Sequence, residues 1–157
     1  QQAIENKTLF LCISAGGGMS MMESLISLSQ MTRTTIAINE LKEKNLPYLV
    51  CITDPTAGGI TASYAMLGDI HIAEPGALIA FAGARVIQGT VKEELPEGFQ
   101  KSEYVEKTGF VDLIVDRKEL SERIGTILSI LLKKNSAIST EENETTENTQ
   151  SLSKVAS

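Results

Sequence analysis

Two short apolar segments, each followed by glycines, constrain the fold of this chain more than any other feature. Leu9–Ser14 (LFLCIS) leads into Gly16-Gly17-Gly18, and Tyr48–Thr53 (YLVCIT) leads into a turn over residues 54–59 that ends in Gly58-Gly59. Apolar runs of this length, closed by turn residues, are typical of buried strands. We therefore expect two strands that each end in a glycine turn.

The segment between these strands predicts a long helix over residues 20–44. Side chains at three- and four-residue steps fall on one helical face: Met21, Leu25, Leu28, Met31 and Thr35. Asn45 and Pro47 end the helix. A strand, a helix and a second strand in this order imply parallel pairing inside an α/β domain.

The rest of the sequence up to residue 134 continues the alternation of helices and strands. In chain order we expect a short helix at 60–67, strands at 71–73 and 77–81, helices at 85–91 and 102–108, a strand at 111–115 and a closing helix at 119–134. Residues 2–4 resemble the end of a further helix. The sequence thus predicts one α/β domain over residues 1–134.

Residues 135–157 differ sharply in composition from the preceding sequence. They consist mainly of Ser, Thr, Asn and Glu, a composition that cannot bury enough surface to offset chain entropy. This predicts a disordered acidic tail. Four of the 20 acidic and one of the 14 basic residues lie there, so half of the formal net charge of −6 belongs to the tail.

Charge, histidine and cysteine counts argue against several classes of protein. A chain with net negative charge lacks the basic face that nucleic acid or anionic lipid requires. No apolar run approaches the roughly 20 residues of a membrane-spanning helix. The chain has a single His, and Cys12 and Cys51 form no CxxC pair, so we expect no metal site and a packing role for both thiols.

The glycine turns are suited to a chemical role as well as a structural one. Glycine permits positive φ and close approach of a ligand, and free N–H groups at a helix start favour an anion. Two such turns together are suited to stabilising an oxyanion, although the pattern alone favours ordinary tight turns. GGGMS is not a phosphate P-loop, and the chain has no GxSxG elbow.

Two longer stretches identify a family. They are SLISLSQMTRTT (residues 24–35) and LPYLVCITDPTAGGITASYAMLGDIHIAEPGALIAFAGARVIQGTVKEELPEGFQKSEYVEKTGFVDLIV (residues 46–115). Both closely resemble the β subunit of the acetyl-CoA carboxylase carboxyltransferase of bacteria and plastids, and the resemblance covers residues 2–134. It implies a crotonase-like α/β fold, a spiral of ββα units.

The resemblance also implies a reaction and its partners. The family transfers a carboxyl group from carboxybiotin, held on the separate biotin carboxyl carrier protein, to acetyl-CoA. This gives malonyl-CoA for fatty-acid biosynthesis. The family works as a heterotetramer of two α and two β subunits, so the resemblance implies the α subunit as a partner, in the bacterial cytoplasm or the plastid stroma.

Candidate site residues follow from the same resemblance. It implies backbone oxyanion donors at Gly17, Gly18, Gly58 and Gly59. It implies substrate contacts at Gly16, Met19, Thr56, Ala57 and Arg85, with Arg85 meeting a CoA phosphate or the partner subunit. A surface or structural ion pair is the alternative role for Arg85.

The chain departs from the family pattern in two respects. Met19-Ser20 stand where the family has Ala-Arg, so activity depends on whether that Arg contacts the substrate. The family pattern also starts before the position that matches residue 1. Its four-cysteine zinc ribbon and the first part of its crotonase-like core lie in that earlier region. We therefore expect an N-terminally truncated domain, from a fragment or a split protein, that binds no metal itself.

Two other functions remain open at the level of sequence. A serine peptidase of the Clp or signal-peptide-peptidase type, from the same superfamily, would use Ser63 as nucleophile and His71 as base. A structural histidine is the simpler interpretation of His71. The third possibility is a truncated subunit that assembles with its partners without turnover.

Overall fold

The computed structural model describes residues 1–18, 23–92 and 94–131, and the chain divides into two compact units, residues 1–119 and 120–157. The first unit holds the sheet and all but one of the described helices. In the second unit the structure describes a single helix, α5 (Leu120–Leu131), where we expected a closing helix over 119–134. The predicted tail, residues 135–157, lies outside the described residues.

The first unit is built on a five-stranded sheet in which every described strand pair is parallel. The order is β1-β2-β3-β5, and β4 pairs with the far end of β2. The strands are β1 (Phe10–Gly16), β2 (Tyr48–Ala57), β3 (Ile70–Ala73), β4 (Ile79–Ala80) and β5 (Leu113–Ile114). The predicted α/β fold with parallel strands is confirmed.

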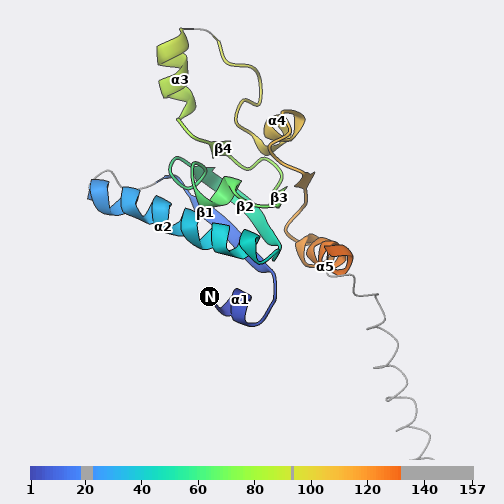
Figure 1. Ribbon diagram of the computed structural model, residues 1–157. Coiled ribbons are helices and arrows are strands. Elements are labelled where there is room, and N and C mark those ends of the chain that lie inside the picture. The colour runs from blue at the N-terminus through green and yellow to red at the C-terminus, as the bar shows by residue number, and fades with distance from the viewer. Residues whose placement is uncertain (19–22, 93, 132–157) are drawn as a thin grey trace, which may run out of the picture. The chain divides into compact units, whose positions relative to one another are not determined.

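Short and long helices connect these strands. They are α1 (Gln2–Glu5), α2 (Ser24–Glu43), the 3₁₀ helix η2 (Tyr64–Met66), α3 (Ala84–Val91) and α4 (Ser102–Lys107). Figure 1 shows α2 running alongside β1 and β2, so that the strand–helix–strand unit expected from the two apolar segments is present. Among the described residues, no helix is long and apolar enough to span a membrane.

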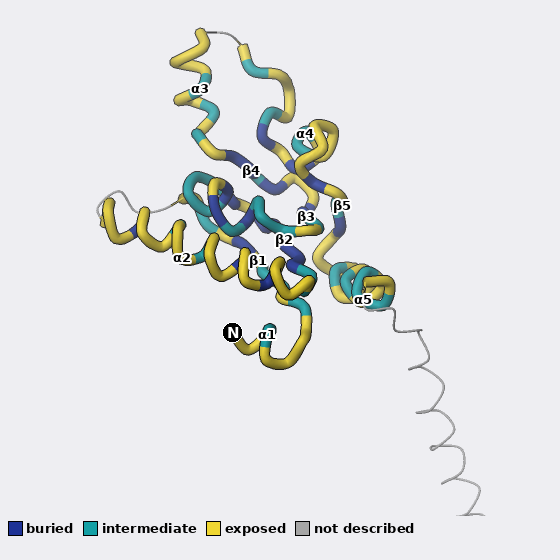
Figure 2. Tube along the Cα trace, in the orientation of Figure 1, coloured by how far each residue is buried: buried dark blue, intermediate teal, exposed yellow. Residues whose placement is uncertain are grey.

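The core lies around β2, the central strand. Its first six residues, 48–53, are all buried, and Leu49, Val50 and Ile52 have no exposed surface. Buried positions follow the strands in Figure 2, whereas most of α2 is exposed. Tyr48 is also fully buried, and its hydroxyl donates to the carbonyl oxygen of Tyr64 at 2.8 Å.

The two cysteines belong to this sheet, as expected. Cys51 is buried in β2, Cys12 is half-buried in β1, and both are free thiols. Burial raises the pKa of both thiols. They are therefore protonated at neutral pH and act as small apolar side chains.

The apolar face predicted for the helix over 20–44 coincides only at Met31 with the inward side of α2, and its first member, Met21, lies outside the described residues. Leu25 and Leu28 are 74% and 58% exposed, whereas the buried residues of the helix are Ser27, Ile38 and Leu41. The inward stripe also includes the half-buried Met31 and Thr34, at alternating four- and three-residue steps. The prediction failed because two of these five positions carry hydroxyls, which a hydrophobic pattern counts as polar.

The region after the first half of β2 also differs from expectation. The predicted turn over residues 54–59 begins later, because β2 continues to Ala57 and pairs there with β4. The predicted helix over 60–67 is a series of turns that contains only η2. Serine and threonine hydroxyls bond to backbone carbonyls in this segment, and such bonds compete with regular helix formation.

One ion pair fixes the chain after β3. The guanidinium of Arg117 donates two hydrogen bonds to the Glu74 carboxylate, one from Nε to Oε1 and one from Nη2 to Oε2 at 2.9 Å. The Glu74 side chain is 11% exposed and that of Arg117 is 77% exposed. The hydrogen bonds from Arg117 lower the pKa of Glu74 below its usual value of 4.5.

We expect Arg117→Gln to reduce stability in a pH-dependent manner. A carboxyl group whose pKa is lower in the folded state stabilises the fold above its unfolded pKa, and this contribution disappears as the pH falls through the folded pKa. The difference in unfolding free energy between wild type and variant should therefore be largest above about pH 4.5 and vanish in stronger acid. Urea unfolding at a series of pH values measures this difference.

The control is Lys118→Gln, which removes a neighbouring charge that does not touch Glu74 and should show no such trend. A deficit in Arg117→Gln that is constant with pH would contradict this account.

Candidate functional site

The two glycine turns lie next to each other. They follow neighbouring parallel strands, with Gly16 at the end of β1 paired with Thr56 near the end of β2. A Cβ atom added to Gly58 would lie 3.0 Å from the Cα of Gly18. The backbones of the two turns are therefore in direct contact, at the carboxyl edge of the sheet where parallel α/β proteins bind their ligands.

Both contacting residues need to be glycine. Gly18 has φ +128° and Gly58 has φ +63°, conformations that L-residues with side chains rarely adopt. A Cβ on Gly58 would also press on the facing backbone of Gly18, which would have to shift by a few tenths of an ångström. The turns therefore require glycine for two reasons: the positive φ of Gly18 and Gly58, and the close approach of one turn to the other.

The turns offer a defined set of backbone donors. The N–H of Gly58 donates to the carbonyl oxygen of Ala80 at 3.0 Å and so is already occupied. For Gly17, Gly18 and Gly59, no acceptor of the N–H occurs within residues 1–18, 23–92 and 94–131. These three amides are the donors that remain for a ligand, whereas Gly58 serves to bring the turns together.

Hydroxyl groups hold the ends of β1 and β2 together beneath the turns. Thr56 is fully buried, and its hydroxyl lies 3.1 Å from the Ser14 hydroxyl and 3.0 Å from the Ser14 carbonyl oxygen. Thr53 donates to the same carbonyl oxygen at 2.8 Å. The Thr56 side chain therefore faces the protein interior, and the half-buried Ala57 beside it pairs with Ala80.

The two remaining residues predicted to contact the substrate are Met19 and Arg85. Met19 lies outside the described residues. Arg85 is exposed in the first turn of α3, and no ion pair forms with it in the part of the chain that the structure describes. Its guanidinium is thus available to a ligand or a partner.

Ser63 and His71 do not form a catalytic pair within the described residues. Ser63 is 5% exposed, and its hydroxyl donates to the carbonyl oxygen of Gly59 at 2.6 Å. His71 Nδ1 lies 3.8 Å from Asp112, and its buried Nε2 has no hydrogen-bond partner there. Burial lowers the pKa of His71, so the ring is neutral at pH 7. These contacts fit a structural histidine.

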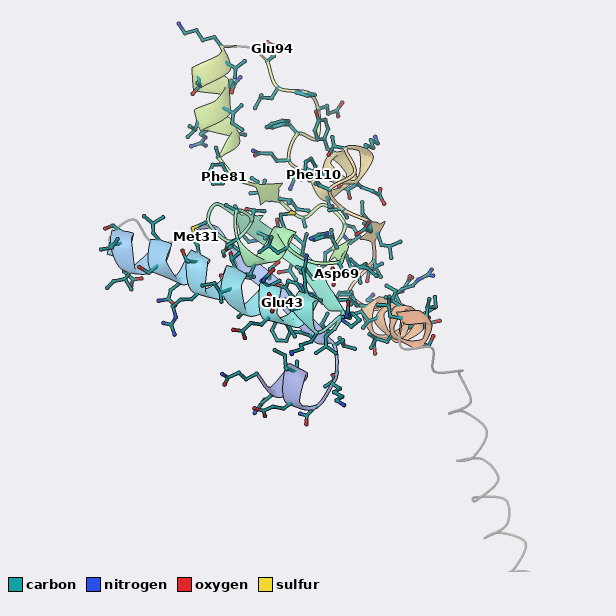
Figure 3. The ribbon with its side chains drawn as sticks, in the orientation of Figure 1. Met31, Glu43, Asp69, Phe81, Glu94 and Phe110 are labelled. Atoms are coloured by element: carbon teal, nitrogen blue, oxygen red, sulfur yellow. The ribbon has the colours of Figure 1, made fainter. Side chains whose placement is uncertain are left out.

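Two grooves flank the sheet. The larger, about 1070 Å³, is lined by the start of β1 and by parts of α1 and α2, including Phe10, Arg33 and Tyr64. It therefore lies at the amino end of β1, away from the glycine turns. The smaller, about 510 Å³, lies behind the second turn and is lined by Thr61 and Ala80 together with aromatic side chains, of which Figure 3 labels Phe81 and Phe110.

No group of three or more His, Cys, Asp or Glu side chains in the described residues is arranged to hold a metal ion. Thr61, which sequence reasoning did not single out, lies beside the second turn. A signal for it existed, because Ser and Thr soon after a glycine turn commonly bond to turn carbonyls.

The parallel sheet defines the chain as an α/β protein, and its likeness to solved structures shows that the fold is crotonase-like. Transcarboxylase 12S shares this fold with a TM-score of 0.70 at 24% identity, over 82% of this chain and 25% of that one. A probable enoyl-CoA hydratase from Mycobacterium thermoresistibile shares it with a TM-score of 0.57 at 15% identity, over 97% and 73% of the two chains. At these identities the likeness shows the fold alone.

Sequence comparison places the chain within one family. Residues 1–155 match the carboxyl transferase domain, and the chain belongs to that family. It is 77% identical to the acetyl-coenzyme A carboxylase carboxyl transferase subunit beta of Pelagibacter ubique (strain HTCC1062), over all of this chain and 51% of the relative. The same subunit of Caulobacter vibrioides (strain NA1000 / CB15N) is 58% identical over 83% of this chain and 42% of the relative. The chain thus spans about half the length of the curated relatives it matches, and the family inferred from its motifs is confirmed.

Proposed function

We propose that this chain forms part of a carboxyltransferase that moves a carboxyl group from carboxybiotin to acetyl-CoA and so makes malonyl-CoA. The observation that carries the proposal is the contact between Gly18 and Gly58, which brings the available amides of both turns to one place. Membership of the carboxyl transferase family supports the reaction class, and the names of its relatives support the substrate.

Backbone amides suit this reaction because its difficult intermediate is an enolate. Carboxybiotin supplies carbon dioxide and a basic ring nitrogen. That nitrogen takes a proton from the acetyl methyl group, and the electron pair moves onto the thioester oxygen. The new carbon–carbon bond then forms at the methyl carbon, and the thioester carbonyl is restored. Each donor aimed at the negative oxygen contributes about 3 kcal/mol.

Individual residues take definite parts in this proposal. The N–H groups of Gly17, Gly18 and Gly59 donate to the thioester oxygen. Gly16 is also proposed to contact the substrate, from the side of its backbone opposite the packed Ile60 side chain. Gly58 keeps the two turns in contact, with Thr56 and Ala57 supporting the end of β2 beneath it. Met19 and the exposed Arg85 are proposed to contact the CoA moiety. No described side chain is needed as the base.

The proposed partners are those of an acetyl-CoA carboxylase. A carboxyltransferase α subunit would complete the active enzyme as a heterotetramer, and a biotin carboxyl carrier protein would deliver carboxybiotin. Exposed apolar side chains at Phe81, directly after β4, and at Val86 and Val91 on α3 offer a surface for such a partner. The proposed location is the cytoplasm of a bacterium.

The reverse reaction tests the proposal. Malonyl-CoA and biocytin are supplied to the assembled enzyme that contains this chain, and acetyl-CoA release is followed with and without biocytin. Biocytin-dependent release is expected, together with no labelling of Ser63 by a fluorophosphonate. Assembly without any biocytin-dependent release would favour the non-catalytic subunit, and labelling of Ser63 would favour the peptidase.

A further inference from the structure

Two buried hydroxyl groups bond to consecutive carbonyls of the second glycine turn. Thr61 is 7% exposed, and its hydroxyl lies 3.1 Å from the carbonyl oxygen of Gly58 and also contacts that of Ala80. Ser63 is 5% exposed, and its hydroxyl lies 2.6 Å from the carbonyl oxygen of Gly59. Thr61 has a single hydroxyl hydrogen, which the carbonyl oxygen of Gly58 shares with the closer one of Ala80. The two hydroxyls therefore contact both carbonyls that flank the backbone of Gly59, and Thr61 also ties the turn to β4.

Because peptide groups are planar, the hydrogen bonds to the Gly58 carbonyl fix the direction of the Gly59 N–H. The carbonyl of Gly58 and the N–H of Gly59 belong to one planar trans peptide and point in opposite directions. The Gly58 carbonyl is bound by Thr61 and also by the N–H of Ala62 at 3.0 Å. The N–H of Gly59 must therefore point away from both residues, out of the turn.

The second peptide of Gly59 is fixed in the same way. Its carbonyl accepts from the buried Ser63 hydroxyl, so rotation of the Gly59–Ile60 peptide would break a short, partly buried hydrogen bond. Rotation would also leave the buried Ser63 hydroxyl without this acceptor, which is unfavourable. Glycine has no side chain to limit its φ and ψ, so without these bonds this position would be among the most mobile of the turn.

We infer that Thr61 and Ser63 are positioning residues that lock both peptide planes of Gly59 and so keep its N–H aimed at the reacting oxygen. The inference rests on the proposed function, because it assigns the Gly59 donor to the enolate of that reaction. It gives Ser63 a role different from nucleophilic attack: its hydroxyl hydrogen is committed to the turn.

The kinetic test uses the assembled enzyme with Thr61→Val, Ser63→Ala and the conservative Thr61→Ser. Thr61→Val keeps the shape of the side chain but removes the hydroxyl. We expect kcat to fall about tenfold in Thr61→Val and in Ser63→Ala, less than the loss of a whole oxyanion donor, with KM for acetyl-CoA within about twofold. Thr61→Ser should retain kcat within about twofold of wild type. Wild-type kcat in both hydroxyl-free variants would overturn the inference.

A matched control separates positioning from general destabilisation. Tyr48→Phe also removes a hydroxyl that donates to a backbone carbonyl, that of Tyr64 in η2, but this bond does not involve Gly58 or Gly59, and Tyr48 begins β2 at the end opposite the turns. It should lower stability by an amount similar to Thr61→Val and leave kcat unchanged. If Tyr48→Phe lowers kcat as much as Thr61→Val does, the loss reflects stability and the positioning role is refuted.

A second readout does not depend on turnover. Hydrogen exchange of the Gly58 and Ala62 amides, which donate to the carbonyl oxygens of Ala80 and Gly58, should be about tenfold faster in Thr61→Val and Ser63→Ala than in wild type, because the turn opens locally more often. Unchanged exchange would overturn the inference even in an inactive assembly. If the wild-type assembly shows no carboxyl transfer but the variants still exchange faster than wild type, the proposed function is rejected. The two hydroxyls would then only stabilise the turn.

Discussion

Gly58→Ala should lower the kcat of carboxyl transfer by about 100-fold or more, because loss of aligned oxyanion donors has an effect of this size. The added Cβ would lie 3.0 Å from the Cα of Gly18, which is tighter than nine in ten real Cβ contacts, so the Gly18 backbone would have to shift by a few tenths of an ångström. The atom that must move is backbone, so no side-chain rotation relieves the overlap. The two turns therefore separate, and their amides no longer converge on one oxygen. Turnover of the assembled enzyme with malonyl-CoA and biocytin measures the loss.

Gly76→Ala is the control for this prediction. Gly76 has φ +67°, almost the same as the +63° of Gly58, but an added Cβ would meet nothing within 4 Å. Both substitutions therefore carry the same conformational cost of about 1–2 kcal/mol, and only Gly58→Ala adds the collision. We expect Gly76→Ala to be less stable and fully active. Equal activity losses in the two variants would mean that strain in the backbone, rather than contact of the turns, accounts for the effect.

Ile52→Ala should have the largest effect on stability, a loss of about 2–5 kcal/mol in the free energy of unfolding. Ile52 is fully buried in β2 and belongs to a core cluster with Tyr48, Val50 and Ala73. Truncation leaves a cavity between the sheet and the segments that cover it, and such cavities collapse only in part. A domain of ordinary stability has only about 5–15 kcal/mol in total, so the variant should unfold at markedly lower urea concentration.

Ile13→Ala removes the same atoms from the neighbouring strand and serves as the comparison. Ile13 is 67% exposed on β1, so its truncation should change stability by about 0.5 kcal/mol or less. Urea unfolding of the two variants and the wild type, followed by circular dichroism, gives both differences. Similar losses of stability at the two positions would contradict the structure, in which Ile52 is buried and Ile13 is exposed.

The strands and the glycine turns could be predicted from sequence because their signals are local. LFLCIS and YLVCIT are almost entirely apolar, and a glycine run closes each. The predicted burial is confirmed for β2 but wrong for β1, in which Ser14 is buried whereas Phe10 and Ile13 are exposed. Parallel pairing followed from the helix between them, and the parallel order placed both turns at one edge of the sheet. The family followed from the long motifs in residues 46–115.

The features that sequence could not give depend on contacts between distant segments. Nothing in the sequence distinguishes Gly58 from Gly59 as a donor. In the structure, however, the N–H of Gly58 donates to the carbonyl oxygen of Ala80, which the pairing of β4 with the end of β2 brings close. The inward stripe of α2 includes Ser27 and Thr34, whose hydroxyls hide it from a hydrophobic pattern. The failure of the helix at 60–67 has the same origin, because the hydroxyls of Thr61 and Ser63 bond to turn carbonyls.

The central claim is that amides of both glycine turns bind the same negative oxygen. The most direct measurement follows the amide signals of ¹⁵N-labelled glycines during titration of the assembled enzyme with a CoA analogue in which a carboxylate replaces the thioester carbonyl, as a mimic of the enolate charge. Our account predicts that the signals of Gly59 and of Gly17 or Gly18 shift downfield together and saturate at the same analogue concentration. Saturable binding that leaves these signals in place, or shifts those of only one turn, would contradict it.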